Sequence, residues 1–312
     1  MPALMTAGAR EAGVARAARS RDGRELVFDS WGDPQGHPVF LLHGTPGSRQ
    51  GPRPRSMVLY QLGIHLIAYD RPGYGGSTRK PGRQVVDAAA DVADIAQFLG
   101  LDAFSVVGRS GGGPHALACA AKLSDRVSSA AVLVSLAPPD AEELDWFEGM
   151  TESNVREYRN ARENLTVLRS TLVQNADAMR ADPMSVLKDL DDEMPDVDRN
   201  VVADAGIRRM LHENFQAGIK QSADGWIDDA VAFSMPWGFD PKEITAPTLL
   251  WHGERDVFSP VKHFTWLAGR IEHATVVLEP SAAHFAAVPV LPKVLGWLRE
   301  QAKTDAAAIT TA

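Results

Sequence analysis

FSVVGRSGGGPHALACAA, residues 104–121, is the stretch of this sequence that decides the fold. Its apolar start ends at Gly108, a single serine, Ser110, follows, and three more glycines lead into an alanine-rich segment. Apolar, β-branched residues favour a strand, and alanine favours a helix. Glycine is a poor residue at the start of a helix, so four glycines around one serine need a reason. Either the chain requires flexibility here, or the serine is held where another molecule can reach it.

Gly108 to Gly112 read G-x-S-x-G between the expected strand and the expected helix, which is the context that a nucleophile on such a turn requires. The turn is tight and raises the serine Oγ above the end of the sheet, and Gly108 and Gly112 avoid a side-chain clash. Because the first N–H groups of a helix lack partners inside it, the Gly111 N–H can donate to an oxyanion. We predict that Ser110 is a nucleophile; the alternative is a glycine-rich turn with an incidental serine.

A serine hydroxyl is a weak nucleophile near neutral pH and needs a base that a third group orients. Among nine histidines, His284 follows the last expected strand on a loop, from which a base can approach the serine. Asp256 also follows a strand end and is the expected acid, with Glu254 as its rival. The simpler alternatives are a surface loop histidine and ordinary solvated carboxylates.

A second oxyanion donor is expected from an early loop, HGTPGSR, residues 43–49. This loop ends an apolar run and turns at Pro46 and Gly47, so the backbone N–H of Thr45 is the candidate beside that of Gly111. Two such donors stabilise the charge that develops on a carbonyl oxygen, by roughly 3 kcal/mol each. We expect His43 to shape the loop by hydrogen bonding and to take no part in proton transfer.

Strand-like and helix-like segments alternate over residues 37–138 and again after residue 247. Continuous apolar runs suit strands buried on both faces, so the expected fold class is α/β, a mostly parallel sheet flanked by helices. Between these parts helical patterns dominate, over residues 155–173, 184–190 and 207–219. The predicted organisation is an N-terminal extension that is a candidate for disorder (1–18), a core (19–138 and 240–302), a helical cap (139–239) and a C-terminal tail (303–312).

Composition restricts the class of protein. With 312 residues and 45% hydrophobic residues the chain can bury a core without disulfides, and its one cysteine, Cys119, is expected in that core. The net charge of −8 argues against a nucleic-acid partner. No apolar run approaches the ~18 residues of a membrane span and no signal peptide is evident, so a cytoplasmic location is expected. Residues 139–240 hold 22 acidic and 10 basic residues, which marks a separate region.

Five motifs together resemble the α/β-hydrolase superfamily: HGTPG (43–47), YDRPGYGGS (69–77), GRSGGG (108–113), GERD (253–256) and AAHF (282–285). The resemblance covers about residues 20–138 and 240–300, with the insertion in the usual position of a helical cap. It implies a triad in the chain order Ser110, Asp256, His284, and a purely structural turn at residues 70–75. A serine at position 110 argues against the haloalkane dehalogenase and epoxide hydrolase branches, which use aspartate there.

The pattern is similar to serine esterases and to prolyl-aminopeptidase-like members of the superfamily. Those aminopeptidases usually read HGGPG and GGSWG, whereas here Arg109 replaces a small residue before the serine. The resemblance implies cleavage of a small to medium, largely apolar carboxylic ester through an acyl-enzyme, with neither metal nor organic cofactor. The alternatives are an aminopeptidase whose acidic cap binds a substrate ammonium, and a ligand-binding receptor with little turnover.

The predicted cap would cover the pocket and select a small-molecule substrate. Candidates for the pocket lining are Arg109 and five aromatic residues, Trp146, Phe147, Trp226, Phe233 and Trp237. The simpler interpretation is that the aromatic residues form part of a core, and that the acidic residues of the cap are solvated helix faces.

Overall fold

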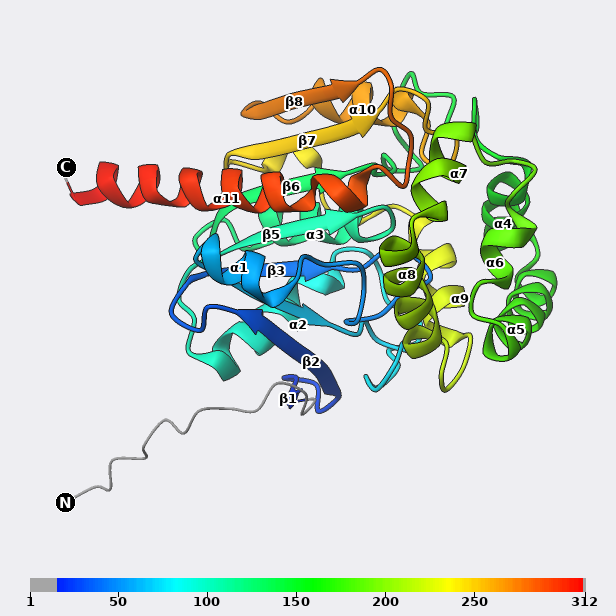
Figure 1. Cartoon of the computed structure of the whole chain (residues 1–312), viewed down its shortest axis with the longest axis horizontal. Coiled ribbons are helices and arrows are strands. Elements are labelled where there is room, and N and C mark those ends of the chain that lie inside the picture. Colours follow the sequence, from blue (N-terminus) through cyan, green and yellow to red (C-terminus); the bar gives the residue numbers. More distant parts are fainter. Residues whose placement is uncertain (1–15, 311–312) are drawn as a thin grey trace.

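Eight strands form one sheet in the described part of the chain, residues 16–310 of a computed structural model (Figure 1). Their order across the sheet is β1-β2-β4-β3-β5-β6-β7-β8. The bounds are β1 (Arg16–Arg19), β2 (Glu25–Gly32), β3 (His37–Leu42), β4 (Ile64–Tyr69), β5 (Phe104–Arg109), β6 (Val127–Leu133), β7 (Thr248–Gly253) and β8 (Ala274–Glu279). β2 is antiparallel to both of its neighbours, β1 and β4, and all other pairs are parallel. The predicted α/β fold class is confirmed.

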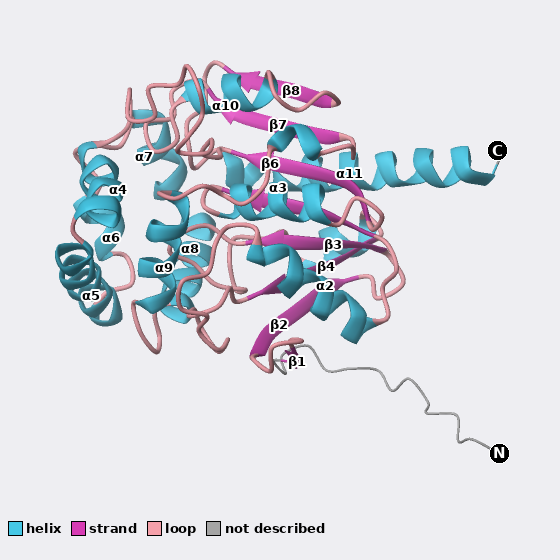
Figure 2. Ribbon diagram, turned by 180° about the vertical axis from the view of Figure 1, so that it is seen from behind, coloured by secondary structure: helices cyan, strands magenta, loops and turns pink. Residues whose placement is uncertain are grey.

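Helices cover both faces of the sheet, so the central strands are buried on both sides (Figures 1 and 2). Nearly every side chain of β5 and β7 is buried, which explains the continuous apolar runs in the sequence. The helices of the two layers are α1 (Ser56–Gln61) and α11 (Ala287–Thr310) on one face, and α2 (Asp87–Leu99), α3 (Gly112–Lys122) and α10 (Val261–Ala268) on the other. Cys119 on α3 is fully buried in the core, as expected.

A helical insertion, residues 134–247, separates β6 from β7 and lies beyond the carboxyl ends of the parallel strands (Figure 2). Its helices are α4 (Glu152–Glu163), α5 (Leu165–Ala181), α6 (Ser185–Asp189), α7 (Asp196–Ala203), α8 (Ala205–Gly218) and α9 (Asp224–Phe233), followed by a short 3-10 helix, Pro241–Glu243. The helix predicted over 155–173 is in fact two helices. Asn164 divides them, because its side chain accepts a hydrogen bond from the Val167 N–H and begins a new helix. α7 and α9 lie outside the three helical segments predicted from the sequence.

Two predicted boundaries differ from the structure. β1 begins at Arg16, so the last residues of the predicted extension (1–18) belong to the sheet, where Arg16 pairs with Phe28. α11 continues to Thr310, through most of the predicted tail (303–312). The candidate disorder of the first dozen residues lies outside the described residues. No helix within residues 16–310 is long and apolar enough to cross a membrane.

The turn from β5 to α3 depends on close backbone contacts. A Cβ on Gly108 would overlap the carbonyl oxygen of Gly112, and a Cβ on Gly112 would overlap the carbonyl oxygen of Leu42 on β3. Ser110, between them, has a φ of 55°, a left-handed conformation that is strained for a residue with a side chain. The glycines therefore provide room for a crowded turn, and they do not make the turn loose.

Gly108→Ala should destabilise the fold by about 1–3 kcal/mol or prevent folding, because the added methyl overpacks the turn against backbone. Gly296→Ala is the matched control, since a Cβ at this position in α11 has no atom within 4 Å beyond its chain neighbours and the adjacent backbone of its own helix. It should stabilise the fold by about 0.5–1 kcal/mol through helix propensity. Denaturant unfolding measures both variants, and equal stability of the two would contradict this account of the turn.

Candidate active site

Three side chains from separate loops form one hydrogen-bonded chain. His284, on the loop between β8 and α11, has its Nε2 atom 2.9 Å from Ser110 Oγ. Its Nδ1 atom is 2.8 Å from Oδ2 of Asp256, on the loop after β7. With the Nδ1–H donating to the carboxylate, Nε2 is free to accept the serine proton. The structure thus brings together Ser110, Asp256 and His284, whereas the rival acid, Glu254, is exposed to solvent.

The buried Asp256 carboxylate is held in place by backbone donors. Its Oδ1 atom accepts hydrogen bonds from the N–H groups of Phe258, at 2.8 Å, and Ser259, at 3.0 Å. Burial by itself would raise the pKa of Asp256, but the neighbouring His284 and these hydrogen bonds hold that pKa below its usual value. The carboxylate therefore stays charged and oriented toward the histidine.

Asp198, on α7 of the insertion, anchors the loop that carries the histidine. Its two carboxylate oxygens accept the backbone N–H groups of His284, at 3.1 Å, and Phe285, at 2.8 Å. Burial raises the pKa of Asp198 to about 6. Sequence reasoning missed this residue, because one carboxylate in the acidic run 191–198 cannot be distinguished from its solvated neighbours without the fold.

Gly111, which follows Ser110, lies against the side chain of Thr45. Both residues line the same cavity as the serine, and a Cβ on Gly111 would overlap the Thr45 hydroxyl. Within residues 16–310 neither N–H donates a hydrogen bond to the protein. The structure thus places the two expected residues next to each other in the cavity that holds the serine.

A buried carboxylate from the insertion, Asp229 on α9, fixes the loop that carries Thr45. Its Oδ2 atom accepts hydrogen bonds from the Thr45 hydroxyl at 2.6 Å, Arg71 at 2.6 Å and the Tyr74 hydroxyl at 2.8 Å, and Oδ1 accepts Arg83 at 2.5 Å. Burial opposes ionisation, but Arg71 and Arg83 hold the pKa of Asp229 well below its usual range. The expected turn at residues 70–75 is therefore also the clamp on the Thr45 loop.

His43 shapes the same loop in one tautomer, as expected. Its Nε2 atom accepts the Arg71 backbone N–H at 3.1 Å, so Nδ1 carries the proton and donates to the Gly44 carbonyl at 2.7 Å. Burial and the nearby Arg71 guanidinium lower the pKa of His43 well below its usual value. The ring remains neutral, and both of its nitrogens are engaged in these two hydrogen bonds.

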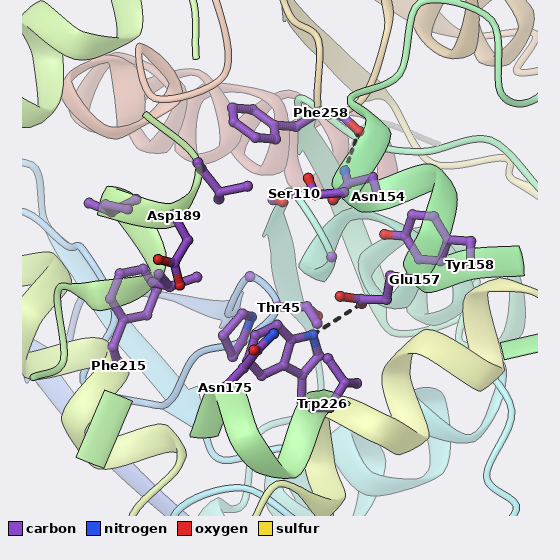
Figure 3. A pocket seen from close by; sticks show the side chains of 18 of the residues that line it. Thr45, Ser110, Asn154, Glu157, Tyr158, Asn175, Asp189, Phe215, Trp226 and Phe258 are labelled. Atoms are coloured by element: carbon purple, nitrogen blue, oxygen red, sulfur yellow. Dashed lines mark hydrogen bonds between the residues drawn. The ribbon is translucent and has the colours of Figure 1, made fainter. Parts of the chain in front are cut away.

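A cavity of about 560 Å³ opens above Ser110, between the strand ends and helices of the insertion (Figure 3). Four of the five expected aromatic residues, Trp146, Phe147, Phe233 and Trp237, do not line it. Trp146, Phe233 and Trp237 are buried in the core beside α3. Phe147 packs against that core and meets the Trp146 ring edge-to-face. These aromatic residues fill the space between the insertion and the sheet. Trp226 does line the cavity, and so does Arg109.

Glu157 on α4 is a carboxylate of the cavity wall, as is Asp189, and sequence reasoning singled out neither. One of its oxygens accepts the Trp226 indole N–H at 3.1 Å, as drawn in Figure 3. Removal from bulk water is the largest influence on this group and raises the pKa of Glu157 to about 7. The side chain can therefore gain or lose a proton near neutral pH.

Comparison with known families assigns the fold. A sequence model of the alpha/beta hydrolase fold family matches residues 37–288, which is most of the chain. The chain belongs to the alpha/beta hydrolase family. The match spans both parts of the core and the insertion between them. This alpha/beta hydrolase carries its hydrogen-bonded serine at the turn that the G-x-S-x-G pattern predicted.

Curated relatives of this alpha/beta hydrolase have several activities. It is 30% identical to a bifunctional esterase/perhydrolase from Acinetobacter calcoaceticus over 38% of this chain and 44% of that protein. It is 28% identical to a non-heme chloroperoxidase from Burkholderia pyrrocinia over 78% of this chain and 82% of that protein. A proline iminopeptidase from Xanthomonas citri is 33% identical over 40% of this chain and 41% of its own length. The chain thus spans less than half the length of the esterase/perhydrolase that it matches.

Solved structures show the same fold at lower identity. An esterase from Thermogutta terrifontis superposes with a TM-score of 0.64 at 22% identity, over 94% of this chain and 99% of that one. An enol-lactonase from Burkholderia xenovorans superposes with a TM-score of 0.65 at 19% identity, over 92% of this chain and 99% of that one. At such identities these likenesses establish the fold alone.

Asp229→Asn should destabilise this alpha/beta hydrolase by about 3–5 kcal/mol at pH 7, because it leaves two buried arginines without a counter-charge. Since the folded-state pKa of Asp229 is lowered, its contribution is fully present above about pH 4, the pKa of an unfolded aspartate, and is lost as the pH falls through the lowered value. The difference in unfolding free energy between wild type and variant should therefore shrink in acid.

Asp177→Asn is the matched control, because Asp177 forms an exposed ion pair with Arg180 on α5. It should change the unfolding free energy by less than about 1 kcal/mol. Urea unfolding at pH 7 measures both variants. If Asp229→Asn lowered the unfolding free energy no more than Asp177→Asn does, the hydrogen bonds and ion pairs of Asp229 would not stabilise the fold.

Proposed function

We propose that this chain is a serine hydrolase that cleaves a small to medium, largely apolar carboxylic ester through an acyl-enzyme intermediate. The observation that carries the proposal is the unbroken hydrogen-bonded chain from Ser110 through His284 to Asp256 at the base of a cavity. A serine in this arrangement has a base for its proton and a carboxylate that stabilises the resulting imidazolium. The esterases among its relatives support the same reaction class.

In the first half-reaction Ser110 Oγ attacks the ester carbonyl carbon, and His284 Nε2 takes the serine proton. The carbonyl oxygen becomes an anion that the N–H groups of Thr45 and Gly111 stabilise. When the carbon–oxygen bond to the alcohol breaks, His284 gives its proton to the departing oxygen. The product alcohol leaves, and the acyl group remains on the serine.

In the second half-reaction a water molecule takes the place of the alcohol. His284 removes a proton from the water as its oxygen attacks the acyl carbon, and it returns that proton to Ser110 Oγ as the carboxylic acid is released. The helices of the insertion form the cap that encloses the acyl and alcohol groups, and the cavity of about 560 Å³ suits a small to medium substrate.

Ser110→Ala should lower the hydrolysis of p-nitrophenyl butyrate by at least ~10⁴-fold, because it removes the nucleophile. The folded state should survive, as judged by circular dichroism and thermal unfolding. Undiminished hydrolysis by the variant would refute the assignment of the nucleophile. A wild-type protein that takes up one acyl group and then stops would instead indicate the third alternative, a ligand-binding receptor with little turnover.

One observation favours a second candidate function, an aminopeptidase that releases an N-terminal residue. Glu157 is a carboxylate on the wall of the cavity, and a substrate ammonium is the kind of group that it could bind. An approaching cation would favour the ionised form of this carboxyl group, whose pKa is about 7. The proline iminopeptidase relatives support this candidate over two fifths of the chain.

If the aminopeptidase candidate is right, the wild type cleaves prolyl or alanyl p-nitroanilide. The KM should fall as the pH rises through about 7, since the raised pKa of Glu157 means that its carboxylate is charged only above that value. Glu157→Gln should raise the KM at least ~10-fold and remove this pH step, whereas Glu152→Gln, an exposed residue on the same helix, should change neither. A wild type without arylamidase activity would end this candidate.

A further inference from the structure

Arg109, the residue before the serine, has its guanidinium at the base of the same cavity. Its Nη2 atom and the Ser110 Cβ atom each lie 3.6 Å from the point that a Cβ on Gly44 would occupy. The two atoms are therefore separated by no more than twice that distance. Arg109 also lines the cavity together with Ser110 and His284. A group that binds this guanidinium would lie next to the reacting carbonyl.

The guanidinium of Arg109 has no acceptor among the residues that the structure describes. Four other arginines withdrawn from solvent form ion pairs with carboxylates: Arg71 and Arg83 with Asp229, Arg49 with Asp70, and Arg24 with Asp91. Among the side chains and backbone groups that the structure describes, no carboxylate, carbonyl or hydroxyl accepts a hydrogen bond from the Arg109 guanidinium. The guanidinium nitrogens are not sealed inside the protein, so they face open space. Since Arg109 lines the cavity, that space is the cavity.

A charge that is partly withdrawn from water and has no counter-ion raises the free energy of the folded protein. Loss of bulk water is the cause of the change in the pKa of Arg109, which falls to about 10, so the side chain remains a cation at neutral pH. A partly buried cation without a counter-ion is stabilised when an anion enters the site. Guanidinium groups bind carboxylates through two parallel hydrogen bonds, which adds directional preference to the attraction between the charges.

We propose that Arg109 binds a carboxylate group of the substrate, so that the preferred esters carry a carboxylate close to the bond that is cleaved. This inference rests on the proposed ester hydrolysis and narrows its substrate class. The carboxylate can belong to the acyl part or to the alcohol part, and both sources share the same chemistry. The rest of the substrate would lie along the largely apolar surface formed by residues such as Leu168, Leu172 and Phe215.

The test compares esters that differ in one charge. For the acyl part, the p-nitrophenyl monoester of glutaric acid is compared with p-nitrophenyl pentanoate. For the alcohol part, 4-acetoxybenzoate is compared with phenyl acetate. The wild type should show the higher kcat/KM for the carboxylate member of at least one pair. Arg109→Gln should lower that preference at least ~10-fold, chiefly through KM, and Arg109→Lys should restore part of it.

Arg53→Gln is the matched control, since Arg53 is also partly withdrawn from solvent but stacks on Trp31 away from the cavity. It removes the same charge and should leave the preference unchanged. Two results would overturn the inference: a wild type that prefers neither carboxylate ester, or an Arg109→Gln variant that slows the charged and neutral esters equally. The second result would mean that Arg109 acts on the oxyanion or on the fold.

A binding measurement separates this inference from the proposed reaction. Calorimetric titration of glutarate into Ser110→Ala should show binding that glutaramide lacks, and the double variant Ser110→Ala/Arg109→Gln should lose it. If glutarate binds through Arg109 but no ester is hydrolysed, the ligand class stands and the proposed reaction is wrong. If esters are hydrolysed through Ser110 but without a carboxylate preference, the reaction stands and this inference is wrong.

Discussion

The contact of the Gly108 and Gly112 backbones is the constraint on which the site depends. Only residues without a side chain allow β5 and α3 to meet at this angle, and the turn leaves Ser110 at a φ of 55°. The strain is tolerated because β5 lies in the middle of a sheet buried on both faces. The flanking glycines fix one conformation, in which the hydroxyl meets His284.

Two carboxylates of the insertion extend that constraint to the rest of the site. Asp229 holds the loop of Thr45, and Asp198 holds the backbone of His284 and Phe285. The insertion therefore contributes to the geometry around Ser110 as well as to the cavity wall. The acidic residues of the insertion were interpreted as solvated helix faces. Two of them, Asp198 and Asp229, are instead fully buried and hydrogen-bonded.

The sequence was informative where chemistry is local and uninformative where it depends on packing. The motif around Ser110 and the loop positions of His284 and Asp256 could be inferred, because strand ends of a parallel sheet meet at one edge. Trp146 and Trp237 were expected in the pocket but lie in the core, since aromatic spacing does not tell which side of a helix faces a cavity. Arg109 was a candidate whose partner no pattern could reveal.

The most direct test of the central claim is to find the covalent intermediate. Wild-type protein is mixed with a rapidly hydrolysed p-nitrophenyl ester, quenched in acid and digested, and its peptides are weighed by mass spectrometry. The account predicts one added acyl group on the peptide that contains Ser110, formed in step with the burst of p-nitrophenol. Steady hydrolysis with no acylated peptide, or with the acyl group on another residue, would contradict it.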